Sequence, residues 1–239
     1  MRRVRDFSLI GLLVVFTGFL YWTVPRHPLV ETDVVRTPAY ATAQAVPGVI
    51  TGNGVNLALQ PGGMQTKRWR KDDVSVTPDA ATSPDGTQTA SLMAASQTNS
   101  LHRIETSVSG ASPGQYHTLS VYAKPVGQSA IQLEMRDATP PGRYGLSICD
   151  LEQGVVSTVH GDVINAGLQQ LPSGWFRCWA AMPYATDQVV FNFAIVRQRE
   201  GNSYSGDGKS GLLLWGPQFE LGTTVGGYSA GAQKANARQ

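Results

Sequence analysis

The uncharged run Phe7–Val24 is the feature that most restricts how this chain can fold. As a helix it is just long enough to cross a hydrocarbon core of roughly 30 Å. Three arginines precede it, and Tyr21 and Trp22 lie near its far end, where amphipathic rings favour the membrane interface. We therefore predict a single-pass inner-membrane protein with residues 1–6 in the cytoplasm, a bilayer-spanning helix at 7–24, and all that follows on the periplasmic side.

A cleaved signal peptide is the alternative interpretation of the same run. The apolar region of a signal peptide is normally about 7–15 residues long and is closely followed by a small-x-small cleavage site. Here bulky residues and Pro25 follow instead, and the small pairs Ala39-x-Ala41 and Ala43-x-Ala45 lie too far downstream. An uncleaved anchor is therefore the favoured prediction.

Beyond the anchor, the composition favours a turn-rich and strand-rich globule. Charged residues make up 15% of the chain, apolar residues 41%, and glycine occurs 26 times. The net charge of +2 arises in Arg2–Asp6, which holds three of the 19 basic and one of the 17 acidic residues. The rest of the chain is neutral overall, so nucleic acid is not an expected partner.

Residues 25–52 have the pattern of an extended tether. Four prolines interrupt this segment and prevent a continuous helix. It nevertheless carries more apolar side chains than a solvated linker needs, so it can lie along a neighbouring protein or pack on its own domain. The candidate tether contacts are Leu29, Val30, Val34, Val35 and Tyr40.

Short strands between turns fill the region from 53 to 229. Several of them alternate with period two, which is typical of strands with one buried face, and no long helix is predicted after the anchor. Strands at this spacing imply an all-β fold, a two-sheet antiparallel sandwich, followed by a polar tail at 230–239. The predicted strands include 74–77, 117–123, 130–135, 145–148, 175–179, 189–195 and 212–215.

The same region carries short motifs in a distinctive order. They are Asn56-Leu57, Trp69, Val74-Ser75-Val76, Pro84-Asp85-Gly86-Thr87, Ser120-Val121-Tyr122-Ala123-Lys124, Asp150-Leu151-Glu152-x-Gly154, Gly174-Trp175-Phe176-Arg177 and Leu214-Trp215-Gly216-Pro217-Gln218-Phe219-Glu220-Leu221-Gly222. This order resembles the jelly-roll modules of the carbohydrate-binding-module type, especially those of phage tail and head-fibre proteins and bacterial surface proteins.

The resemblance covers 53–228 and implies a jelly-roll form of the sandwich, with Trp175 and Trp215 as framework residues. Modules of this type often hold a structural calcium ion. Asp85, Asp150 and Glu220 are conceivable oxygen ligands, although they do not lie at the spacing of a calcium-binding loop.

Two cysteines occur, Cys149 and Cys178, both in strand-like segments beyond the anchor. A disulfide between them could persist in an extracytoplasmic compartment. Two buried free thiols fit the sequence nearly as well, because free cysteine is commonly buried. The spacing and the lack of His or Cys neighbours argue against zinc, and no cofactor is expected.

Catalytic activity is not expected, because an enzyme needs a nucleophile or metal with a base held beside it. The four histidines are scattered and form no ligand-spaced pair. Gly208-Lys209-Ser210 matches the end of a phosphate-binding loop, but Ser203 stands where the first glycine belongs.

Two non-catalytic functions remain open. The favoured one is an interaction or structural subunit of a larger membrane protein assembly, and the alternative is a membrane-tethered carbohydrate-binding module. Alternation places Trp175 and Trp179 on one face of a strand with Arg177 between them, which suits either a sugar-stacking surface or core packing. The candidate glycan or partner contacts are Trp179, Arg177 and Tyr144.

Overall fold

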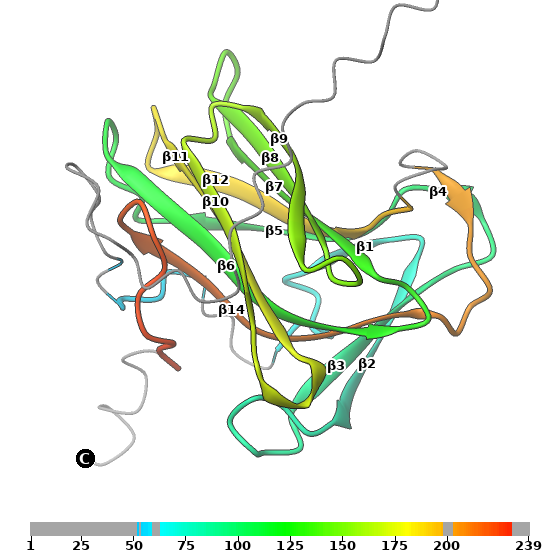
Figure 1. Ribbon diagram of the computed structural model, residues 1–239. Helices are drawn as coiled ribbons and strands as arrows, with labels where there is room; N and C mark the ends of the chain where they lie inside the picture. The colour runs from blue at the N-terminus through cyan, green and yellow to red at the C-terminus, as the bar shows by residue number, and fades with distance from the viewer. Residues whose placement is uncertain (1–51, 53, 59–62, 198–202, 231–239) are drawn as a thin grey trace, which may run out of the picture. The chain divides into compact units, whose positions relative to one another are not determined.

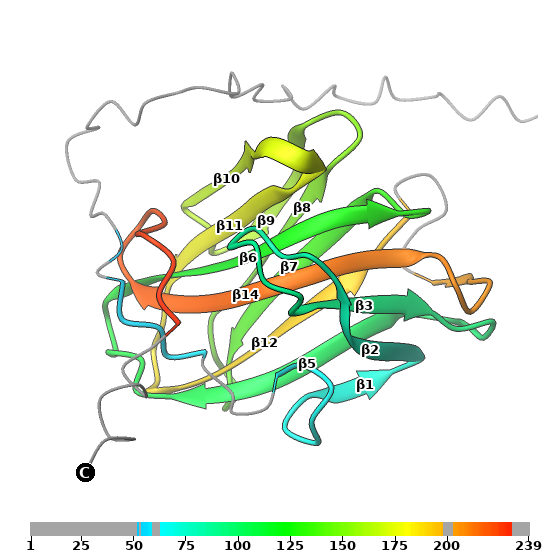
Figure 2. The same cartoon turned by 90° about the horizontal axis from the view of Figure 1, so that it is seen from below.

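The computed structural model describes residues 52, 54–58, 63–197 and 203–230. In these ranges the chain forms two six-stranded antiparallel sheets packed face to face, with a separate two-stranded ladder (Figure 1, Figure 2). The helical content of these ranges is a single 3-10 turn, Pro172–Gly174. The predicted all-β, two-sheet antiparallel sandwich is confirmed, whereas its jelly-roll form and its boundaries at 53 and 229 remain predictions.

Sheet I joins strands that are distant in the sequence. β12, for example, lies between β5 and β7, so it pairs on both sides with strands that are distant from it in the sequence. In spatial order the strands are β1 (Arg70–Asp72), β5 (His102–Ser109), β12 (Gln188–Ile195), β7 (Ala130–Asp137), β8 (Tyr144–Asp150) and β9 (Val155–Gly161).

Sheet II contains the two longest strands, β6 and β14, side by side at its centre. In spatial order its strands are β10 (Asn165–Gln170), β11 (Phe176–Pro183), β6 (Tyr116–Val126), β14 (Gly211–Leu221), β3 (Ala90–Ala95) and β2 (Val74–Ala81). β4 (Asn99–Ser100) and β13 (Tyr204–Ser205) form the small ladder.

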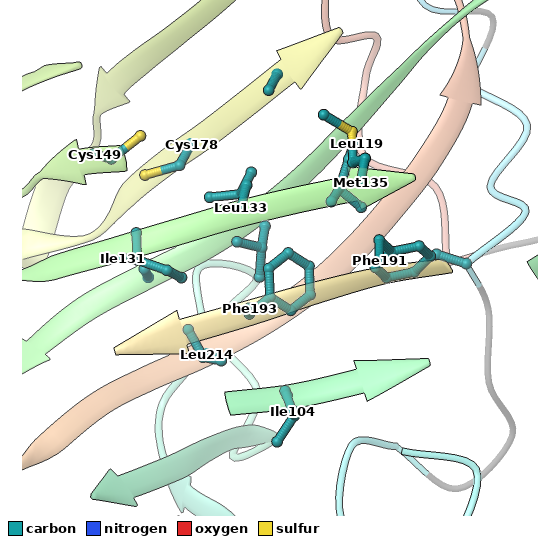
Figure 3. Packing of buried hydrophobic residues seen from close by; sticks show 14 of the residues in the cluster. Ile104, Leu119, Ile131, Leu133, Met135, Cys149, Cys178, Phe191, Phe193 and Leu214 are labelled. Atoms are coloured by element: carbon teal, nitrogen blue, oxygen red, sulfur yellow. The ribbon is translucent and has the colours of Figure 1, made fainter. Parts of the chain in front are cut away.

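The hydrophobic core lies between the two sheets and is built from strands in which apolar side chains occupy every second position. On β7, every second side chain is apolar and fully buried, from Ile131 through Leu133 to Met135. Phe191 and Phe193 on β12 point into the same layer (Figure 3). Truncating one of these phenylalanines to alanine should cost about 3–5 kcal/mol.

Cys149 on β8 and Cys178 on β11 lie in this core, and their side chains point toward each other from opposite sheets (Figure 3). Both are buried free thiols in this structure. Burial, with a smaller contribution from the neighbouring Cys149, raises the pKa of the Cys178 thiol well above its ordinary value. The disulfide remains a prediction, and it would join the two sheets.

The anchor at 7–24, the tether contacts from Leu29 to Tyr40 and the tail from 231 onward lie outside the described residues. Within the described ranges, no helix has the length and apolar character required to cross a bilayer. Membrane anchoring and topology therefore remain predictions from the sequence.

Candidate functional site

The three side chains singled out as candidate contacts do not form one site. Arg177 and Trp179 lie on β11, on the face of sheet II that points away from the core, because the alternate residue Cys178 points inward. Tyr144 lies at the start of β8, in sheet I. The structure therefore separates Tyr144 from the other two by the thickness of the sandwich.

Arg177 has a structural role in this fold. Its Nη1 donates a hydrogen bond to the Gly226 carbonyl at 2.6 Å, and its Nη2 donates to Ser120 Oγ at 3.2 Å. The guanidinium also lies over the ring of Tyr122, 5.2 Å from the centroid. Burial lowers the pKa of Arg177, and Tyr122 and Glu220 act in the opposite direction. These contacts leave Arg177 buried and committed within the domain.

Residues 222–229, here called the strap, cover this part of sheet II. The fully buried Glu220 carboxylate accepts hydrogen bonds from the Gly226 backbone N–H at 2.9 Å and the Gly54 N–H at 2.8 Å. Asn56 Nδ2 donates to the carbonyls of Pro217 and Ser229. Both ends of the described sandwich are thus fixed onto the same sheet.

The aromatic residues of sheet II pack beneath the strap. Tyr228 of the strap lies 4.3 Å from Trp215, centroid to centroid, and its ring meets Tyr122 edge-on. Trp175 belongs to the same buried cluster. The prediction that Trp175 and Trp215 are framework residues is confirmed by their burial.

Trp179 is only half-buried but is closely packed. A Cβ atom built at Gly167 on the neighbouring β10 would fall 2.0 Å from Cζ2 of the Trp179 indole. Gly167 is therefore required for this tryptophan to lie against the sheet. The indole Nε1–H is buried and has no hydrogen-bond partner within the described residues.

The outer face of sheet I is different, because it is polar and no strap covers it in the described ranges. Core residues such as Leu133, Phe193 and Ile104 alternate with polar ones, which must therefore point outward. We call this surface the polar sheet face. It comprises Arg70, Asp72, Arg103, Glu105, Gln132, Glu134, Arg136, Tyr144, Leu146, Ile148, His160, Asn192 and Ala194.

Strand register arranges these side chains in rows across the strands. Glu105, Asn192, Glu134 and Leu146 are successive partners on β5, β12, β7 and β8. With strands about 4.8 Å apart, this row spans roughly 14 Å. The row combines an amide and two carboxylates with an apolar side chain, which is a suitable surface for a polyhydroxylated ligand.

Ion pairs occupy the part of the polar sheet face that lies over β1 and β5. Arg103 Nε contacts Asp72 Oδ2 at 2.8 Å, and Arg70 Nη2 lies 3.2 Å from Glu105 Oε1. Arg136 reaches from β7 across β12 to Glu105 Oε2 at 3.1 Å. Each of these arginines is therefore already matched by a carboxylate.

Two amide side chains at the centre of the face have unsatisfied oxygens. Gln132 is 2% exposed and Asn192 is 1% exposed, yet Gln132 Oε1 and Asn192 Oδ1 have no hydrogen-bond partner within the described residues. Gln132 Nε2 donates to Glu134 Oε2 at 3.2 Å, which fixes the orientation of that amide. A buried acceptor left unsatisfied costs about 1–3 kcal/mol, so a ligand hydroxyl that displaced the covering side chains and reached these oxygens would bind favourably.

Tyr144 is the aromatic residue of this face. It is 36% exposed, and its ring meets His160 edge-on with centroids 6.3 Å apart. Burial raises the pKa of the Tyr144 hydroxyl, and the nearby negative charge of Glu134 adds to the effect. Tyr144 is therefore a neutral phenol at physiological pH, able both to stack and to hydrogen-bond.

The conceivable calcium ligands are engaged in other contacts. Asp85 accepts hydrogen bonds from Ser83 and Thr87, Asp150 accepts from the Glu152 and Gln153 N–H groups, and Glu220 holds the strap. No group of three or more metal-ligating His, Cys, Asp or Glu side chains occurs in the part of the chain that the structure describes.

Sequence reasoning missed Gln132 and Asn192 as candidate site residues. Each is the polar member of an alternating strand, and such residues ordinarily face solvent. The available signal was the pair of polar residues 132 and 134 within the predicted strand 130–135. What the sequence could not show is that β12 lies next to that strand and places Asn192 beside it.

Comparisons with known proteins give similarity in structure only. No protein-family model matches the sequence, and no curated protein matches it. Among solved structures, the enzymatically active domain of bacteriophage CBA120 tailspike protein 4 is 16% identical over 70% of this chain, with a TM-score of 0.42. The match spans 21% of that tailspike chain.

Two carbohydrate-binding modules are also similar. TmCBM61, solved with β-1,4-galactotriose, is 9% identical over 70% of this chain and 97% of its own, with a TM-score of 0.39. The CBM22-1 xylan-binding domain of Paenibacillus barcinonensis Xyn10C is 16% identical over 67% of this chain and 89% of its own, with a TM-score of 0.37.

Proposed function

We propose that this protein is a non-catalytic carbohydrate-binding module whose ligand lies on the polar sheet face. The observation that carries the proposal is the pair of buried, unpartnered amide oxygens of Gln132 and Asn192. Sugar hydroxyls are both donors and acceptors, so one hydroxyl can donate to an amide oxygen and accept from a neighbouring donor. Tyr144 and Leu146 supply a flanking surface for the apolar face of a sugar ring.

The charge balance of the face favours a neutral glycan. Arg70, Arg103 and Arg136 are each held by Asp72 or Glu105. A uronate or sulfate group would have to compete with these carboxylates for an arginine and would also approach Glu134. We therefore expect neutral polysaccharides to bind better than acidic ones.

The anchor at 7–24 completes the proposal by giving the module a location. It would hold the sandwich on the periplasmic side of the inner membrane, within reach of envelope or surface glycans. Protease added to intact spheroplasts should digest the sandwich, and full protection would contradict this topology.

A polysaccharide array tests the binding proposal. The full chain in detergent micelles is applied to neutral glycans such as xylan, galactan and β-glucan, and to acidic ones such as polygalacturonate. Retention on at least one neutral polysaccharide is expected, with loss of retention in an Asn192→Leu variant. Retention only on acidic polymers, or equal retention of the variant, would contradict the proposal.

A role as an interaction subunit of a membrane assembly is the second candidate. Val159 on β9 and Ile164 in the following turn are 51% and 53% exposed, and β9 and β10 are the edge strands of their sheets. Together with the apolar tether residues Leu29, Val30, Val34, Val35 and Tyr40, this edge could contact a partner protein. Deleting 29–50 should then abolish co-purification of that partner in mild detergent, and unchanged co-purification would place the association elsewhere.

A further inference from the structure

A concave site lies away from the polar sheet face, where two strand pairings of sheet II are irregular. The pairing of β2 with β3 shifts register between Thr77 and Ala81, and that of β14 with β6 shifts between Trp215 and Gln218. β3 lies between β2 and β14 (Figure 2). β-bulges, one cause of such register shifts, redirect side chains and are over-represented next to active sites.

A pocket of about 350 Å³ opens beside these two register shifts. This volume is at the lower end of the range of roughly 300–1,000 Å³ found for small-molecule sites, so it suits one ring rather than a chain. The pocket shares no residue with the polar sheet face. The residues that line it include Trp69, Pro78, Asp79, Thr89, Trp215 and Tyr228.

Three aromatic side chains, Trp69, Trp215 and Tyr228, line this pocket, and their packing holds them in place. Trp215 donates its Nε1–H to Thr89 Oγ1 at 3.1 Å and packs against Tyr228. A Cβ atom at Gly216, whose φ is +58°, would lie 2.8 Å from Cε2 of Tyr228, so the glycine permits this packing. The rings are therefore preorganised before any ligand arrives.

The pocket lining also includes one unpartnered donor, which is buried in the wall, and one exposed acceptor. Trp69 is 1% exposed, and its Nε1–H has no hydrogen-bond partner within the described residues. Asp79 is exposed at a φ of +52°, a left-handed conformation that Asp tolerates better than most residues. Within the described residues, its carboxylate has no ion pair or hydrogen bond that would compete with a ligand.

We infer that this pocket binds a single neutral sugar ring, such as the terminal residue of a glycan. The indole N–H can donate to a ring hydroxyl and the Asp79 carboxylate can accept from another, while the aromatic walls contact the apolar face of the ring. The carboxylate is the one formal charge among the lining residues named above, so anionic sugars are disfavoured. This inference is independent of ligand binding on the polar sheet face.

Fluorine NMR of the full chain labelled with 5-fluorotryptophan tests the pocket separately from the polar sheet face. The chain has five tryptophans, whose signals are assigned with single Trp→Phe variants. Titration with galactose, glucose or xylose should shift the Trp69 and Trp215 signals in a saturable manner and leave the Trp179 signal unchanged. Asp79→Asn, which keeps the backbone conformation accessible, should weaken the apparent affinity roughly tenfold.

Asp187→Asn is the matched control, because Asp187 is an exposed carboxylate that does not line the pocket. It should leave the titration unchanged. The inference is overturned if none of the three sugars shifts the Trp69 and Trp215 signals, or if Asp79→Asn and Asp187→Asn behave alike. It is also overturned if choline shifts these signals while the sugars do not, since that would indicate a site for an organic cation.

Discussion

The two outer faces of the sandwich differ in what their side chains contact. On sheet II, Arg177, Glu220 and the rings of Tyr122 and Trp215 contact the strap and are used inside the domain. On sheet I, the polar sheet face carries ion pairs and two unsatisfied amide oxygens. Aromatic content alone therefore does not locate a sugar site. Hydrogen-bonding groups that have no partner within the fold are the better guide.

The largest effect is expected where sheet II holds the strap. Glu220→Ala removes a buried carboxylate that accepts from Gly54, Gly226 and Gln218, and it leaves those donors unsatisfied. We expect the free energy of unfolding to fall by about 3–5 kcal/mol. Chemical denaturation measures this change, with the exposed Glu152→Ala as control. A loss of less than about 1 kcal/mol would mean that the strap is not held in this way.

The next effect concerns Trp179, the tryptophan that the sequence left least explained. Because it is half-buried against Gly167, Trp179→Ala should cost about 2–3 kcal/mol, less than a fully buried tryptophan. Glycan retention should persist. A variant of unchanged stability that no longer binds polysaccharide would instead place the glycan site on the outer face of sheet II and not on the polar sheet face.

A smaller effect is expected on the polar sheet face. Arg136→Ala removes the ion pair that spans β12, and because this arginine is partly exposed, stability should fall by no more than about 1 kcal/mol. Thermal unfolding measures this, and the wild-type ion pair should contribute less as salt is added. A loss of several kcal/mol would show that the network is a structural element comparable to the strap.

The sequence was sufficient for the fold because its strands alternate clearly. In 130–135 and 189–195, apolar residues at every second position identify both the strands and their core faces. Gln132 and Asn192 are outward members of those same strands, but their proximity depends on a pairing between segments about sixty residues apart. The position of the strap could not be predicted from the sequence either. The segment after Gly222 has little periodicity, and its position depends on contacts with Arg177 and Glu220.

The central claim is tested most directly by replacing both unsatisfied amides with apolar residues of similar size. In the double variant Gln132→Leu/Asn192→Leu, no buried oxygen is left without a partner at these positions, so stability should stay within about 1 kcal/mol of wild type or rise. Binding to the neutral polysaccharide retained by the wild type, measured by affinity electrophoresis, should fall at least tenfold. Gln170→Leu, on the edge strand β10, should bind normally. A stable double variant with wild-type affinity would contradict the proposal that the polar sheet face is the glycan site.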